Sequence, residues 1–300
     1  MEVRSTTSQY DATDRVLWDM IGHSASHMRQ GSDVPGRITR LPGGVALNIA
    51  MTLKRFGVEP VLLSSIGRDA DGDALIKACE GMGLDCGYIY RSDDLPTDRY
   101  MAIEGANGLI AAIADAHSLE TTEDKILTPL TSGPFGTPEE PFTGTISLDG
   151  NLTQSLLEHI AVSPLFAACD LCVAPASPGK AERLLPLLAR GRALLYVNLE
   201  EAGLLCQTQY DTASEAAQAL LGKGARRVLV TDGAKPACDA GQGEIFIQTP
   251  PDVLETRVTG AGDTFMAAHM AAELAGAARA DALRHALETA ARYVSGDTAL

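Results

Sequence analysis

Apolar residues follow two patterns along this chain. Short, nearly continuous apolar runs such as Pro60–Gly67 and Arg226–Gly233 are typical of buried β-strands. Longer segments such as Val45–Gly57 and Asp71–Gly83 repeat apolar residues every three or four positions and end in glycine, which predicts helices. Because the two patterns alternate, we expect an α/β fold with a mainly parallel sheet and helices on both faces.

The same patterns predict further elements. Strands are expected at Val16–Gly22, Gly144–Leu152, Asp170–Ser177 and the first part of Ala193–Leu205, and helices at Thr212–Gly224 and Asp281–Gly296. The first of these helices has a threonine in the capping position and a glycine at its end.

Two segments interrupt this alternation. Ser24–Leu41 is polar and has no helical period, whereas Thr97–Asp115 is typical of a hairpin with its turn at Gly105–Gly108. We expect them to form a small sheet from about residues 24–42 and 94–117, placed as a lid over a site. The length of 300 residues then fits a single domain over residues 1–300.

Composition narrows the possible functions. The formal net charge of −15 repels phosphate backbones, so we expect no nucleic-acid partner, although a local pocket can still bind a small anion. No apolar run reaches the roughly 18 residues of a membrane helix, and the N-terminus lacks a signal-peptide core. We interpret Cys169 and Cys172 as small buried hydrophobes, and the scattered cysteines predict a cytoplasmic protein.

Polar residues recur where the predicted strands end. In open parallel sheets, ligands bind at the carboxyl ends of the strands, so these residues are candidates for a cleft, although each one alone fits ordinary turn chemistry. They are Gly67, Asp69, Asp149, Asn151, Asn198, Glu201, Thr231 and Gly233.

The segment Gly260–Asp263 is the strongest chemical signal. Gly260, Ala261 and Gly262 can present consecutive backbone N–H groups at the start of a helix, which suits a developing negative charge on a phosphoryl group. Asp263 lies where a carboxylate can accept a proton from an attacking hydroxyl. The alternative is an ordinary helix N-terminus in which Asp263 belongs to the capping region.

Several motifs resemble, in order, those of the ribokinase-like (PfkB) sugar and nucleoside kinases. "VTGAGDTF" resembles their C-terminal signature, and "LPGGVALNIAMTLKRFG" followed by "IGRDADG" resembles their N-terminal one. "VNLEE" resembles the family's N-x-x-E motif, and "VLVTDG" resembles the strand that ends at the nucleotide. The resemblance implies a three-layer αβα domain with a mainly parallel central sheet and a small β-sheet lid.

The resemblance also implies site residues and cofactors. It implies transfer of the γ-phosphoryl group of ATP to a sugar hydroxyl, with Asp263 as general base and the amides of Gly260–Asp263 as the anion hole. It implies Mg²⁺ near Glu201, through water. The remaining implied residues are Asn198, Thr231, Gly233, Gly260 and Gly262 for the nucleotide, and Gly43, Gly44, Asn48, His27, Asp115 and Asn151 for the acceptor.

Within the family, "GLIAAIADAHSLE" and "SLDGNL" look most like pseudouridine kinases. The resemblance therefore implies phosphorylation of the 5′-hydroxyl of pseudouridine, ahead of another nucleoside such as adenosine or inosine, and ahead of a simple sugar such as ribose or fructose. It also implies a homodimer that forms through the lid.

Three departures from the family pattern bear on activity. The segment Gly22–Met28 has Ala25 and His27 near places where the family usually has Asn and a sugar-binding Asp. Arg257 replaces an Asp that commonly helps bind a monovalent cation, so we expect no potassium site of the usual kind. Pro236 replaces a glycine. These changes leave a second hypothesis open, a ligand-binding relative with impaired catalysis, which the retained Asp263 disfavours.

Overall fold

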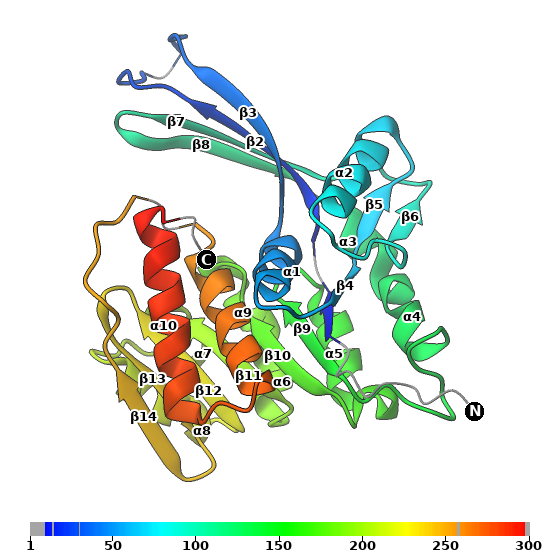
Figure 1. Ribbon diagram of the computed structural model, residues 1–300, viewed down its shortest axis with the longest axis vertical. Coiled ribbons are helices and arrows are strands. Elements are labelled where there is room, and N and C mark those ends of the chain that lie inside the picture. Colours follow the sequence, from blue (N-terminus) through cyan, green and yellow to red (C-terminus); the bar gives the residue numbers. More distant parts are fainter. Residues whose placement is uncertain (1–9, 14, 30, 257–258, 298–300) are drawn as a thin grey trace.

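The computed structural model describes residues 10–13, 15–29, 31–256 and 259–297. An eight-stranded sheet lies between two layers of helices, and a separate four-stranded sheet projects from one end (Figure 1). The large sheet has the order β14-β13-β12-β11-β10-β9-β1-β4, and the strands from β12 to β4 are all parallel. The predicted α/β fold with a mainly parallel sheet is confirmed.

The bounds of the large-sheet strands follow from their pairing. They are β1 (Tyr10–Thr13), β4 (Pro60–Leu63), β9 (Thr145–Asp149), β10 (Asp170–Ala174), β11 (Ala193–Asn198), β12 (Arg227–Asp232), β13 (Lys235–Gly241) and β14 (Glu244–Gln248). The sequence patterns did not predict the antiparallel pair β13 and β14 at the edge. Pro236, which has no N–H to donate, lies in β13 at a position that pairs with neither neighbouring strand.

Helices cover both faces of the large sheet. One face carries α1 (Val45–Arg55), α9 (Ala261–Leu274) and α10 (Arg279–Ser295). The other carries α5 (Gln154–Val162), η3 (Pro178–Leu184), α6 (Leu185–Ala189), α7 (Leu199–Cys206) and α8 (Ala213–Gly222). The remaining elements are α2 (Ala70–Gly81), β5 (Ser65–Gly67), β6 (Tyr90–Ser92), α3 (Ser118–Thr122), η1 (Glu123–Leu127), α4 (Thr128–Thr131) and η2 (Pro164–Phe166).

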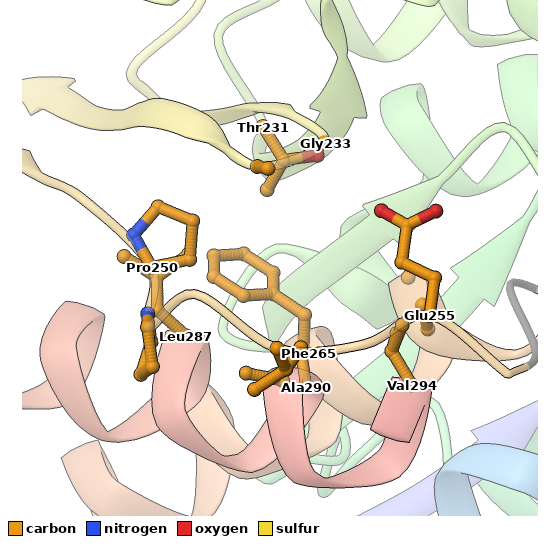
Figure 2. Close-up of a pocket in the computed structure, with 14 residues that line it drawn as sticks. Thr231, Gly233, Pro250, Glu255, Phe265, Leu287, Ala290 and Val294 are labelled. Atoms are coloured by element: carbon orange, nitrogen blue, oxygen red, sulfur yellow. The ribbon is translucent and has the colours of Figure 1, made fainter. Parts of the chain in front are cut away.

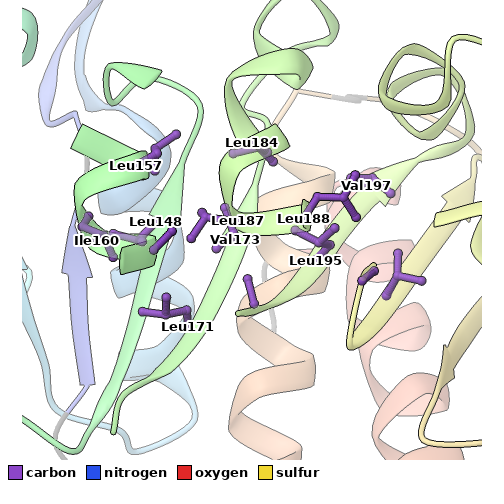
Figure 3. Close-up of a cluster of buried hydrophobic side chains, with 14 of the residues drawn as sticks. Leu148, Leu157, Ile160, Leu171, Val173, Leu184, Leu187, Leu188, Leu195 and Val197 are labelled. Atoms are coloured by element: carbon purple, nitrogen blue, oxygen red, sulfur yellow. The ribbon is translucent and has the colours of Figure 1, made fainter. Parts of the chain in front are cut away.

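The central strands of the large sheet are mostly apolar because both of their faces are buried. In β11, Leu195 and Val197 face the α5–α8 layer (Figure 3), whereas Leu194 and Tyr196 face α9 and α10. Each fully buried leucine stabilises the fold by about 2 kcal/mol relative to an exposed one. The alternation therefore fixes β11 between the two layers, and a one-residue shift would exchange its two faces.

The small sheet has the order β3-β2-β7-β8, formed by β2 (Leu17–His23), β3 (Arg37–Gly43), β7 (Arg99–Gly105) and β8 (Gly108–Asp115). The predicted hairpin is confirmed, with Gly105 paired to Gly108. The expected start of the small sheet near residue 24 was wrong, because β2 pairs with β3 and β7 and contributes nothing to the large sheet. The first large-sheet strand is instead β1, whose four residues are too few to show a period.

Asp71, in the first turn of α2, anchors the base of the small sheet. Its backbone oxygen accepts a hydrogen bond from the Trp18 indole nitrogen at 2.9 Å. Its carboxylate accepts from Arg40 at 2.9 Å and also pairs with Arg99. One helix turn therefore contacts β2, β3 and β7 at their body-proximal ends and sets the position of the small sheet.

The structure bears on two predictions from composition, the burial of the cysteines and the lack of a membrane helix. Cys169 and Cys172 are each 6% exposed beside or within β10, as the apolar run predicted. All six cysteines are buried. Among the helices of the described residues, none has both the length and the apolar character to cross a membrane.

Candidate active site

A cleft of about 730 Å³ lies between the strand ends of the large sheet and the small sheet. Leu17, Asp19, Tyr100 and Ala114 line it from the small sheet, which therefore forms one wall of the cleft. The cleft brings together eleven of the residues selected from the sequence, which come from segments far apart in the chain. They are Gly44, Asn48, Asn151, Asn198, Glu201, Thr231, Gly233, Gly260, Ala261, Gly262 and Asp263.

The glycines at the start of α9 differ in what requires them. Gly260 has a left-handed backbone (φ 88°), and a Cβ there would lie 2.5 Å from the Tyr293 hydroxyl, so the fold itself requires glycine. Gly262 is helical, and a Cβ there would meet no atom of the described residues within 4 Å apart from the backbone of its own helix. The fold does not require glycine at position 262, so the space beside it is available to a ligand in the cleft.

Asp263 lies in the first turn of α9, where the helix dipole favours a negative charge. Its Oδ2 accepts a hydrogen bond of 2.8 Å from the Asn48 amide nitrogen. Asn48 lies in α1, which begins directly after Gly43 and Gly44. The glycine pair at the start of α1 and the glycine segment at the start of α9 thus meet through this hydrogen bond.

Asn198 and Glu201 form a capping box at the start of α7. The Asn198 Oδ1 accepts from the Glu201 backbone N–H at 2.8 Å, and the Glu201 Oε2 accepts from the Asn198 N–H at 2.9 Å. The capping box by itself is a structural reason for an asparagine at position 198 and a glutamate at position 201. Burial raises the pKa of Glu201, and the nearby carboxylates of Glu200 and Asp263 add to the increase. A cation bound in this part of the cleft would offset that burial cost.

Asp19 places a third carboxylate in the cleft wall, beside those of Glu201 and Asp263. It lies in β2, beside Gly43, and a Cβ at position 43 would overlap its carboxylate. Burial raises the pKa of Asp19 to about 6. A carboxylate in this position can accept hydrogen bonds from the hydroxyl groups of a polar ligand.

Basic residues line the cleft at the base of the small sheet. The Asn151 Oδ1 accepts from the Arg15 Nη1 at 3.4 Å and also from the Lys180 Nζ. The Asn151 backbone N–H and amide nitrogen both donate to Asp149, at 2.6 and 2.8 Å. This part of the cleft therefore presents N–H donors from two cations.

An apolar slot of about 150 Å³ opens beside the start of α9 and shares Thr231, Gly233, Ala261, Gly262 and Phe265 with the cleft. Figure 2 shows its walls, which come from the β12 end, the segment after β14, α9 and α10. The apolar residues that complete it are Pro250, Pro251, Val253, Leu287, Ala290, Ala291 and Val294. A flat, mostly apolar ring fits a slot of this kind.

Six residues selected from the sequence do not line the cleft, and three of them, Gly67, Asp69 and Asp149, come from the predicted strand ends. Gly43 is buried behind Asp19. Asp115 is exposed at the end of β8. His27 is exposed beyond β2, next to Met28, whose N–H donates to Asn107 in the β7–β8 turn at 3.1 Å. Arg257, from which we predicted that the usual potassium site is missing, lies outside the described residues.

Sequence reasoning missed several cleft residues. The carboxylate in the small-sheet wall is Asp19, whereas the segment with Ala25 and His27, where we looked for it, lies at the far end of β2. An aspartate between apolar residues in "VLWDMIG" was the available signal. Arg15 and Lys180 gave no signal, because isolated basic residues are usually on solvated surfaces.

Comparisons with known proteins show which family the chain belongs to. The family model described as pfkB family carbohydrate kinase matches residues 9–297. An Arabidopsis thaliana pseudouridine kinase is 26% identical over 242 residues, which cover 71% of this chain and 60% of that protein. An Escherichia coli pseudouridine kinase is 26% identical over 257 residues, covering 83% of this chain and 78% of the other. An uncharacterized Escherichia coli sugar kinase is 29% identical over 278 residues, covering 91% and 74%.

Solved structures agree with the fold. A carbohydrate kinase from Agrobacterium tumefaciens has a TM-score of 0.81 and 25% identity, covering 98% of this chain and 92% of the other. An Arabidopsis thaliana ribokinase complexed with ribose and ATP has a TM-score of 0.77 and 20% identity, covering 96% and 92%.

Proposed function

The chain belongs to the pfkB family of carbohydrate kinases, and from this premise we propose that it is an ATP-dependent nucleoside kinase that phosphorylates the 5′-hydroxyl of pseudouridine. The observation that carries the proposal is the Asn48–Asp263 hydrogen bond at the start of α9. The start of this helix lines both the cleft and the apolar slot. Two pseudouridine kinases among the relatives support the choice of acceptor.

Each part of the site has a role in this proposal. The adenine ring of ATP occupies the apolar slot, next to Thr231 and Gly233 at the end of β12. The γ-phosphoryl group then lies at the N–H groups that begin α9, and Gly262 leaves space for it. Asp19 accepts hydrogen bonds from the ribose hydroxyls, and Asn151 and Lys180 contact the nucleobase.

The reaction is a single phosphoryl transfer. The acceptor hydroxyl gives its proton to the Asp263 carboxylate, its oxygen forms a bond to the γ-phosphorus, and the bond from that phosphorus to the β–γ bridging oxygen breaks to release ADP. The amide of Asn48 holds the Asp263 carboxylate in place before transfer. The N–H groups of residues 260–262 stabilise the charge on the transferring oxygens.

The family implies a divalent metal with ATP, and the cleft offers one carboxylate, that of Glu201, that fits a metal bound through water. Mg²⁺ prefers oxygen ligands and keeps several waters when it binds phosphates. Glu201 is 8% exposed in the cleft wall, and its raised pKa reflects a charge that a cation would stabilise. We propose that Glu201 would hold Mg²⁺ through water, and that the metal would supply positive charge to the phosphates. We also propose that no potassium site of the usual kind is present, because Arg257 replaces the usual Asp.

Turnover tests the proposal directly. ADP release is measured with Mg-ATP and pseudouridine, uridine, adenosine, inosine, ribose or fructose, with and without potassium. We expect the highest kcat/KM with pseudouridine and a loss of about 10²- to 10⁴-fold in kcat for Asp263→Asn. Turnover confined to another nucleoside or sugar would replace pseudouridine as the acceptor. No turnover with any compound would favour the ligand-binding relative.

We further propose that two copies pair through the outer face of the small sheet, in the cytoplasm. Met101 and Ile113 are paired across β7 and β8 and are 46% and 67% exposed, and Ile38 in β3 is 76% exposed. Apolar side chains gathered on one sheet face are typical of a contact surface. Buried cysteines scattered along the chain are typical of a protein in a reducing compartment. Sedimentation measures the mass in solution of Ile113→Glu and of the unchanged protein. Equal masses would exclude pairing through this face.

A further inference from the structure

Arg15 is a buried cation at the base of the small sheet. It is 9% exposed and lines the cleft. It lies between β1 and β2, and its partners Asp98 and Ala116 lie directly before β7 and directly after β8. Arg15 therefore occupies the point where the small-sheet strands leave the body of the molecule.

Protein groups hold the Arg15 guanidinium loosely. Only the Nη2 bond to the Ala116 backbone oxygen is short, at 2.8 Å. The Nη1 bond to Asn151 is 3.4 Å, and Nε lies 3.5 Å from the Asp98 Oδ2. Both Nε and that Oδ2 are buried and make no hydrogen bond within the described residues. Buried charged groups normally satisfy such atoms, so this cation retains donor capacity that its protein partners do not use.

The surroundings of Arg15 select for hydrogen-bond acceptors. Arginine and lysine side chains carry donors and no acceptor. The Asn151 side-chain oxygen, a neutral acceptor 3.4 Å from the Arg15 Nη1, already receives bonds from both Arg15 and Lys180. A ligand oxygen can accept hydrogen bonds from the N–H groups of Arg15 and Lys180. A ligand amino group in the same place would instead put one hydrogen-bond donor next to another.

We propose that Arg15 determines acceptor specificity by donating to a ring carbonyl oxygen of the acceptor's head group, the part of the acceptor remote from the hydroxyl that is phosphorylated. This inference rests on the proposed kinase function and deepens it. Arg15 selects pyrimidinedione nucleosides over nucleosides that carry an amino group, and it is not needed for a sugar that lacks a head group.

The test compares Arg15→Met/Asp98→Asn with the unchanged enzyme. The second substitution avoids a buried carboxylate without a counter-charge, and an asparagine oxygen still accepts from Ser118, whose hydroxyl donates to Asp98 at 2.6 Å. Asp98→Asn alone is one control. Arg192→Met is the matched control, because Arg192 also donates to backbone oxygens, those of Phe166 and Ala167, away from the cleft. Steady-state kinetics use pseudouridine, uridine, cytidine and ribose, and calorimetry measures pseudouridine binding without ATP.

We expect the double variant to raise KM and the calorimetric Kd for pseudouridine by about 10- to 100-fold, the usual effect of losing a charged hydrogen bond. KM for ATP and ribose should change by less than about threefold, and the preference for uridine over cytidine should disappear. Equal losses with ribose and pseudouridine, or unchanged pseudouridine binding, would overturn the role of Arg15. Absence of turnover by the unchanged enzyme with every acceptor would refute the kinase proposal instead, and the binding measurement would still decide the role of Arg15.

Discussion

Replacing Asp19 by asparagine should stabilise the protein while weakening acceptor binding. Burial in the cleft wall raises the pKa of Asp19 from 3.8 to about 6. A carboxyl whose pKa is higher in the folded state prefers to be neutral there, so its charge costs stability as pH rises from about 4 to about 6, and the cost is constant above that range. Asparagine has the same shape and carries no charge, so it removes the cost.

The size of the gain follows from the pKa. A pKa difference of about two units corresponds to about 3 kcal/mol at most, at roughly 1.4 kcal/mol per unit. Because the side chain is only partly buried, solvent screening reduces this to about 1–2 kcal/mol. For a chain of this size, that is an increase in Tm of a few degrees at pH 8. At pH 5 the folded carboxyl is mostly protonated, and the gain should be roughly half as large.

Calorimetric melting of Asp19→Asn at pH 8 and pH 5, together with acceptor kinetics, measures both effects. Asp115→Asn is the matched control, because Asp115 is exposed at the end of β8 and does not line the cleft. We expect it to change neither Tm nor KM. A decrease in Tm at pH 8, or an equal gain at both pH values, would refute the reasoning from burial. An unchanged acceptor KM for Asp19→Asn would remove Asp19 from the acceptor site.

Three other substitutions test the site and the fold. Gly262→Ala should keep the Tm of the unchanged protein, because a Cβ there meets no side chain of the described residues, but it should lower kcat at least tenfold by intruding on the phosphoryl group. Gly260→Ala is the contrasting variant: because φ at position 260 is 88°, it should lower the free energy of unfolding by about 1–3 kcal/mol in thermal melts. Leu287→Trp should fill the apolar slot and raise KM for ATP while leaving KM for the acceptor unchanged in initial-rate assays. Arg279→Met should destabilise the fold by about 3–5 kcal/mol in urea melts, because Asp239 is fully buried between Arg279 and a second arginine, and a loss below 1 kcal/mol would contradict that account.

Local patterns in the sequence determined the elements whose neighbours are close in the chain. The helix Val45–Gly57 was predicted to within two residues, because its apolar period and glycine end are local features. The hairpin over Thr97–Asp115 was predicted for the same reason, since its turn fixes the pairing of β7 with β8. The segment Gly260–Asp263 was selected from its glycines and carboxylate, and it begins α9 as expected.

Only the tertiary structure decided which strands share a sheet and which side chains share the cleft. A strand was predicted at Val16–Gly22, and β2 forms at Leu17–His23. Its place in the small sheet depends on pairing with β3 and β7, which local sequence does not specify. Asp19 and Arg15 entered the cleft through that same pairing. The Asn48–Asp263 contact joins residues 215 positions apart. Such contacts form only when packing of the whole core brings α1 and α9 together, and no local pattern records that packing.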